Sequence, residues 1–118
     1  MPPTKTPDLL QGTLDVMILR TLERAENHGY GIARAIEAAA SGQFAIEEGS
    51  LYPALYRMEQ RGLLASDWKT ADSGKEAKYY RLTKAGLKAL ESEKESWQRL
   101  RAAIDLVLAS KLLKTGDA

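Results

Sequence analysis

The sequence predicts a mainly α-helical fold with a small β component, a winged helix-turn-helix followed by a long C-terminal helix. Three observations support this prediction. Three segments with the apolar spacing of amphipathic helices come first, and two short alternating segments around a polar, Gly-containing turn follow them. The last apolar pattern continues further than a typical globular helix. With 118 residues, the chain can form one domain and an appended element.

The N-terminal part of the chain is predicted to hold an arm and two helices. Residues 1–8 contain three prolines and no periodicity, so we expect a flexible arm there. The winged helix-turn-helix domain is expected over residues 9–83. Its first helix is predicted over Gln11–Asn27, ended by an Asn-His-Gly sequence, and its second over Tyr30–Ala40. The only histidine, His28, is expected to cap a helix or to lie on the surface.

The third helix is predicted over Ser50–Arg61. Ser50 is the expected N-cap and Gly62 the expected residue just after the helix end. Pro53 is expected in the first turn, where its missing N–H breaks no intrahelical hydrogen bond. These signals together predict a short helix with defined ends.

The third helix is also predicted to carry functional side chains. Its apolar residues fall on one face, and Pro53, Tyr56 and Arg57 fall roughly opposite them. The major groove of DNA admits one helix, whose hydroxyl, phenol or guanidinium groups can reach the base edges. We therefore expect base contacts from Ser50, Tyr56 and Arg57. An ordinary solvated helix face is the alternative. The expected core side is formed by Leu51, Leu55 and Met58.

A β-hairpin is predicted after the third helix. Its strands are expected over Leu63–Thr70 and Ala77–Thr83, joined by a polar turn at residues 71–76. Lys75 and Lys78 lie near the tip, where basic side chains can contact DNA phosphates and fix the register of the protein. A solvated turn is the alternative, because two acidic residues lie beside these lysines.

The last helix is predicted over residues 84–114, with Thr83 as its N-cap and a tail at residues 115–118. It carries an apolar stripe, which monomers rarely expose, so we expect a homodimer. Packing of the stripe on its own domain is the alternative. Trp97 further suggests that two tryptophans clamp a flat aromatic effector between subunits, with plain interface packing as the alternative. The expected dimer residues are Leu90, Trp97, Leu100, Ile104, Val107 and Leu108.

Composition narrows the possible functions. The chain has no cysteine, one histidine and no convergent carboxylate cluster, so we expect no enzyme, no metal site and no cofactor. No segment has the character of a membrane span or a secretory signal, and a cytoplasmic protein is expected. The net charge is only +1, but residues 57–84 hold seven basic and four acidic residues, a modest local positive field.

Four blocks of sequence, in this order and spacing, resemble the PadR family of regulators over nearly the whole chain. The blocks are Gly12-Thr13-Leu14 with Ile18-Leu19, then His28–Ile32, then Gly49–Leu55 followed by Glu59 and Gly62-Leu63, and finally Lys78–Thr83 with Gly86. The chain is similar to the short branch of the family, which has a single C-terminal helix.

The resemblance implies a winged helix domain, a dimer built by the C-terminal helix, and repression by operator occupancy. Some short relatives bind flat aromatic drugs between paired tryptophans, which Trp97 resembles. We therefore expect a ligand-responsive repressor that binds a pseudo-palindromic site in double-stranded DNA as a homodimer. The alternative is a winged-helix module that binds a protein partner and no specific DNA. By resemblance, DNA would lie at or near Tyr30, Ser50, Tyr52, Pro53 and Tyr56, with Lys75 and Lys78 on the wing.

Overall fold

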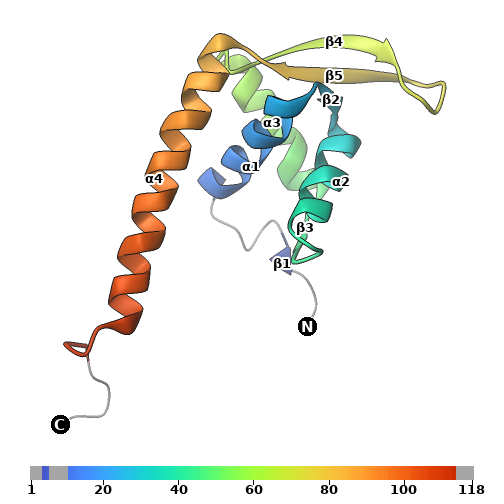
Figure 1. Ribbon diagram of the computed structural model, residues 1–118. Helices are drawn as coiled ribbons and strands as arrows, with labels where there is room; N and C mark the ends of the chain where they lie inside the picture. Colours follow the sequence, from blue (N-terminus) through green and yellow to red (C-terminus); the bar gives the residue numbers. More distant parts are fainter. Residues whose placement is uncertain (1–3, 6–10, 114–118) are drawn as a thin grey trace.

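The structure is a computed structural model that describes residues 4–5 and 11–113 (Figure 1). It confirms the predicted mainly helical fold with a small sheet. The elements in chain order are β1 (Thr4–Lys5), α1 (Gln11–Arg24), β2 (Asn27–His28), α2 (Gly29–Ala39), β3 (Phe44–Ala45), α3 (Glu48–Gln60), β4 (Leu64–Thr70), β5 (Glu76–Leu82) and α4 (Lys84–Ala109).

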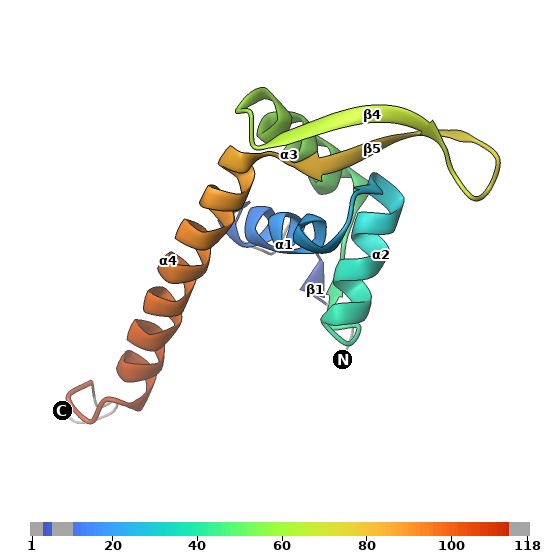
Figure 2. The same cartoon turned by 45° about the horizontal axis from the view of Figure 1, so that its top comes forward.

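The hydrophobic core lies where α1, α2 and α3 meet the base of the β4–β5 hairpin. The predicted core face of α3 is confirmed, since Leu51, Leu55 and Met58 are buried together with Ala54. The β4–β5 hairpin, which we call the wing, extends to one side of this core, and α4 leaves its base toward the other side (Figures 1 and 2). The molecule is therefore elongated, with extents of 64 × 33 × 21 Å.

The sheet has one strand more than the predicted hairpin. β2 pairs antiparallel with β5, giving the order β2-β5-β4. The Asn-His-Gly sequence thus acts as a short strand and as the start of α2, and α1 ends earlier than predicted, at Arg24. His28 takes the capping role expected for it, because its Nδ1 accepts a hydrogen bond of 3.0 Å from the Gly31 N–H. β2 thereby links the first two helices to the wing.

The start of α3 differs from the prediction. Glu47 is the N-cap, without a side-chain capping bond, and Ser50 lies inside the first turn. Pro53 therefore falls one turn further in, where the missing N–H leaves the Gly49 carbonyl without its usual helical partner. The predicted end is confirmed, since Arg61 is the C-cap of α3 and Gly62 follows it with φ +77°.

A hydrogen-bonded junction joins α3, the wing and α4. The Thr83 hydroxyl donates to the Gly62 carbonyl oxygen at 2.6 Å and accepts from the Gly86 N–H at 3.0 Å. The Thr83 N–H donates to the Leu63 carbonyl oxygen at 3.2 Å. Thr83 is thus the N-cap of α4, as predicted, and it also fixes the origin of α4 to the end of α3.

The two ends of the chain meet the predictions only in part. Within the expected arm, Thr4–Lys5 pairs in parallel with Phe44–Ala45, and the rest of residues 1–8 lies outside the described residues. α4 ends at Ala109, earlier than the expected end near residue 114, because Ser110 adopts an extended backbone with ψ 130°. Residues 114–118, which include the predicted tail, lie outside the described residues.

Candidate nucleic-acid interface

The exposed side of α3 presents aromatic and polar groups at the surface. Tyr56 is 64% exposed, Tyr52 and Pro53 are also exposed, and Ser50 is half-buried. The buried opposite side holds the helix in place, so these side chains are presented by a rigid element. A phenol can donate or accept a hydrogen bond, and its ring can pack against a sugar or base. This face can therefore make both polar and apolar contacts to nucleic acid.

Tyr52 of α3 lies against the start of α2. The Tyr52 ring covers Gly29, since a Cβ added to Gly29 would come within 2.6 Å of the Tyr52 Cε1 atom. The next residue, Tyr30, is 64% exposed and has the Arg34 guanidinium 5.3 Å from its ring centroid. The exposed surface of α3 thus continues onto the N-terminal end of α2, where backbone N–H groups favour anions such as phosphate.

Arg57 does not extend freely from the surface of α3. Its Nη2 atom lies 2.9 Å from Oδ1 of Asp15 on α1, and its side chain is about one-third exposed, at 34%. Hydrogen bonds to a carboxylate orient a guanidinium strongly. Arg57 therefore ties α3 to α1 and keeps only part of its side chain at the surface.

The two wing lysines have different surroundings. Lys75 is exposed in the turn, whereas Lys78 on β5 lies 3.1 Å from Glu59 on α3 and 5.6 Å from the centroid of the Tyr80 ring. The hydrogen bond with Glu59 raises the pKa of Lys78. Lys75 is thus the more accessible wing cation, and Lys78 is held against α3.

Glu59 connects the wing to α3 through both strands. Its Oε2 accepts a hydrogen bond of 2.6 Å from the Ser66 hydroxyl on β4, while its Oε1 contacts Lys78. The Ser66 hydrogen bond, and after it the interactions with Lys78, hold the pKa of the Glu59 carboxyl below its ordinary value despite some desolvation. Burial raises the pKa of the neighbouring Tyr80 hydroxyl. The charged forms of Glu59 and Lys78 therefore stabilise each other.

Trp68 is a surface residue of the wing that the sequence analysis did not single out. It is 69% exposed and lies directly opposite Lys78 in the β4–β5 register. Directly opposite residues in an antiparallel pair share one face of the sheet, so Trp68 lies on the face that carries Lys78. The strand alternation alone could have placed Trp68 on that face once its register was known.

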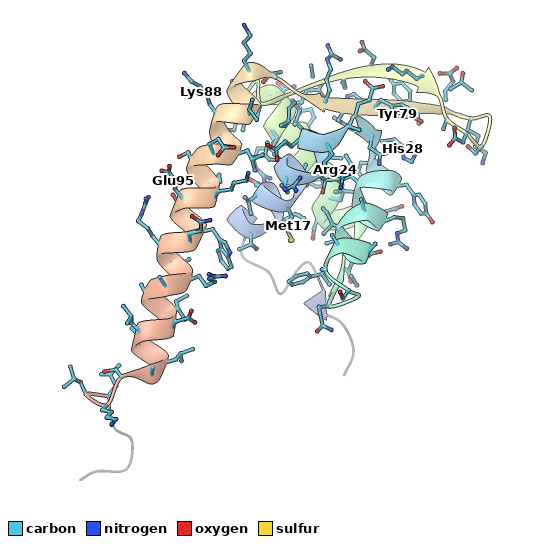
Figure 3. The ribbon with its side chains drawn as sticks, in the orientation of Figure 1. Met17, Arg24, His28, Tyr79, Lys88 and Glu95 are labelled. Atoms are coloured by element: carbon cyan, nitrogen blue, oxygen red, sulfur yellow. The ribbon has the colours of Figure 1, made fainter. Side chains whose placement is uncertain are left out.

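The apolar stripe of α4 divides into a buried and an exposed part. Leu90, which we expected at a dimer interface, is 0% exposed and belongs to the core of its own chain. The residues further along are exposed, and Ile104 is 45% exposed. Lys88 and Glu95 point away from α1, on the outer side of α4 (Figure 3). The remaining expected dimer residues, all exposed, are Trp97, Leu100, Ile104, Val107 and Leu108.

Trp97 borders a groove between α1 and α4. The groove has a volume of about 230 Å³, and Trp97 and Leu100 line it from α4 while Val16 lines it from α1. Flat apolar compounds match an apolar groove of this kind. Among the residues that the structure describes, no group of three or more acidic, His or Cys side chains is placed to hold a metal ion. No helix within the same residues is long and apolar enough to cross a membrane.

Comparison with known proteins places this arrangement in a family. The model of the transcriptional regulator PadR-like family matches residues 18–92. A PadR family transcriptional regulator of Eggerthella lenta is 35% identical, with a TM-score of 0.71 and 86% of each chain covered. A transcriptional regulator of Clostridium thermocellum is 30% identical, with a TM-score of 0.75, covering 83% of this chain and 95% of that one. The Mycobacterium tuberculosis transcriptional regulator Rv3488 is 34% identical over 76 residues, 64% of this chain and 69% of its own.

Proposed function

Because the chain belongs to the PadR-like family of transcriptional regulators, we propose that it is a homodimeric repressor that binds a specific operator in double-stranded DNA. The observation that carries this proposal is the exposure of three tyrosines on α2 and α3, Tyr30, Tyr52 and Tyr56, with the Tyr52 ring against Gly29 at the start of α2. Such a regulator acts on DNA in the cytoplasm.

In the proposed complex, α3 enters the major groove and the wing lies on the neighbouring backbone. Ser50 and Tyr56 contact base edges, and Arg57, oriented by Asp15, contacts a base or a nearby phosphate. The wing Lys75 contacts a phosphate and fixes the register of the protein along the duplex. Tyr30, Tyr52 and Pro53 lie against the sugar–phosphate backbone. Lys78 contributes to the positive surface of the wing from its place beside Glu59.

The proposed dimer forms through the exposed part of the α4 stripe. Trp97, Leu100, Ile104, Val107 and Leu108 stay exposed in the single chain, and pairing of two copies removes this apolar surface from water. In a two-fold dimer the same residues meet on both sides, and the two α3 helices reach successive major grooves about one helical turn apart. The operator is accordingly a pseudo-palindrome.

We also propose that a flat aromatic effector binds at Trp97. The groove beside Trp97 is open to solvent in the single chain and has the apolar lining that such a compound needs. An effector changes DNA affinity only if it binds the DNA-competent and incompetent arrangements differently. The expected effect is release of the operator, checked by DNA binding with and without a flat aromatic dye and by repetition with Trp97→Ala.

The main experiment compares binding to the DNA flanking the coding region with binding to random-sequence DNA, at two salt concentrations. Tyr56→Ala removes an exposed side chain and should weaken operator binding by about 1–3 kcal/mol while leaving binding to random DNA nearly unchanged. Lys75→Ala should weaken binding to all sequences and reduce the salt slope by about one unit. Lys88→Ala, on the outer side of α4, is the matched control and should change neither quantity.

The result that would contradict the proposal is equal affinity of the wild type for flanking and random DNA. Selection from a random DNA pool then separates two explanations. Recovery of a consensus would indicate an operator elsewhere in the genome. Recovery of no consensus would favour the winged-helix module that binds a protein partner.

A further inference from the structure

The Glu59 side chain on α3 is bonded to both strands of the wing. Its carboxylate accepts a hydrogen bond from Ser66 on β4 at 2.6 Å and forms an ion pair of 3.1 Å with Lys78 on β5. Charge-assisted hydrogen bonds of this kind are stronger and more directional than neutral ones. One side chain therefore links the helix to the whole width of the hairpin.

The strand register explains why this link reaches both strands. Ser66 lies opposite Tyr80, and Trp68 lies opposite Lys78, so these four residues share one face of the hairpin. Tyr80 is buried in the core on that face, which directs Ser66 and Lys78 toward α3. Glu59 thus binds the hairpin next to the buried Tyr80, at the edge of the hydrophobic core.

A second ion pair between the wing and the helical part is weaker than the Glu59 contact, because it is more exposed to solvent. Lys69 on β4 pairs with Glu26, between α1 and β2, and both side chains are exposed. Exposed ion pairs contribute little because water and salt screen them and because two long side chains lose conformational freedom. The Glu59 side chain is less exposed, at 24%, and is bonded at both oxygens. Of these two ion pairs, the Glu59 contact therefore defines the angle between the wing and α3 better.

We propose that Glu59 is a positioning residue that raises the preference for the operator over other DNA by fixing the wing to α3 and by holding Lys78 back from phosphates. The proposal rests on the proposed DNA-binding function. A wing fixed to α3 reaches the backbone correctly only when α3 is in register with its bases. A Lys78 released from Glu59 would instead contact phosphates of any sequence, since such contacts carry no sequence information.

The test compares three variants with the wild type in the full chain. Glu59→Ala removes both links. Ser66→Ala removes the β4 link and leaves the Lys78 pair in place. Glu76→Ala is the matched control, because Glu76 is an exposed wing carboxylate that accepts a hydrogen bond of 3.1 Å from the Thr70 hydroxyl, within the wing itself. Like Glu59→Ala, it removes one negative charge, but the charge comes from the wing and the Glu59 links to Ser66 and Lys78 stay in place.

Three quantities are measured for each protein: affinity for the operator, affinity for random DNA with its salt slope, and NMR order parameters of the β4 backbone amides without DNA. Glu59→Ala should bind random DNA roughly 3- to 10-fold more tightly, with a salt slope steeper by about one unit, because Lys78 becomes available. Its preference for the operator should fall about tenfold or more, and the β4 order parameters should fall from about 0.85 toward about 0.6. Ser66→Ala should lower the order parameters without the gain on random DNA.

The proposal is overturned if Glu59→Ala leaves the β4 order parameters and the random-DNA affinity at the wild-type values, or if Glu76→Ala reproduces its effects. A uniform loss on operator and random DNA alike would also overturn it, because that result indicates only a structural role. If the wild type shows no operator preference, the proposed function fails. The order parameters and the random-DNA affinities then still decide whether Glu59 fixes the wing and restrains Lys78.

Discussion

Replacement of Gly86 by alanine should destabilise the fold strongly, although alanine is the better helix former. Gly86 is buried in the first turn of α4, where a Cβ atom would overlap the carbonyl oxygen of Leu63. The overlap is with backbone, so no side-chain rotation relieves it, and the start of α4 must move away from the base of the wing. This movement strains the Thr83 bonds that join the two elements.

The size of the effect follows from two opposing contributions. Gly to Ala in a helix stabilises by about 0.5–1 kcal/mol, whereas overpacking costs about 1–3 kcal/mol and more when backbone must shift. The net expectation for Gly86→Ala is a loss of about 2 kcal/mol in the free energy of unfolding. For a domain of this size that loss lowers the melting temperature by roughly 6–12 °C.

Gly49→Ala provides the matched control for this measurement. Gly49 also lies in the first turn of a helix, but no atom lies within 4 Å of the Cβ position there. Thermal unfolding followed by circular dichroism, at equal protein concentrations, should therefore show Gly49→Ala at or slightly above the wild type and Gly86→Ala far below it. Equal melting temperatures for the two variants would refute the close approach of α4 to Leu63.

Three further predictions concern single contacts. Leu90→Ala should lower the free energy of unfolding by about 2–5 kcal/mol. Ile104→Ala should chiefly raise the dimer dissociation constant in sedimentation equilibrium. The reverse pattern would indicate that Leu90 belongs to the dimer interface and not to the core. His28→Ala should lower stability by about 0.5–2 kcal/mol through loss of the α2 cap, and His28→Asn should restore much of it in urea unfolding. Ser66→Ala should raise the pKa of Glu59 toward its ordinary value in an NMR titration. The stability that the Glu59 carboxylate contributes is present above its unfolded pKa and is lost as pH falls through its folded pKa. Because the folded pKa is higher in Ser66→Ala, this variant should lose that stability at a higher pH than the wild type. An unchanged Glu59 titration would contradict the role of the Ser66 hydrogen bond.

Much of the fold was predictable because local signals agree with the tertiary structure. The three short helices, the hairpin, the cap at Thr83 and the helix end at Gly62 all depend on spacing or on residues with special backbone preferences. The β2 strand was not predictable in this way. Asn27 and His28 pair with residues of β5 more than fifty positions further along the chain, and a two-residue strand has no periodicity of its own.

The candidate site was predictable in its residue types but not in its internal pairing. Helical spacing correctly placed Tyr56 on the exposed side of α3, but it could not show that Arg57 on the same side pairs with Asp15, which comes from another helix. The same spacing put Leu90 and Ile104 on one stripe, although only the first is covered by its own chain. Periodicity identifies the apolar face of α4, but the packing of α4 against the domain determines how much of that face is buried within the single chain.

The Thr83 junction gives α4 the mechanical character of a lever with its fulcrum at the base of the wing. A straight helix of 26 residues is about 39 Å long, so a rotation of only about 5° at the junction displaces its far end by about 3 Å. If the paired α4 helices are held fixed, the same rotation moves the α3 surface and the wing together as one rigid unit. Slight angular changes at three hydrogen bonds are thereby converted into displacements comparable with the rise of one DNA base pair.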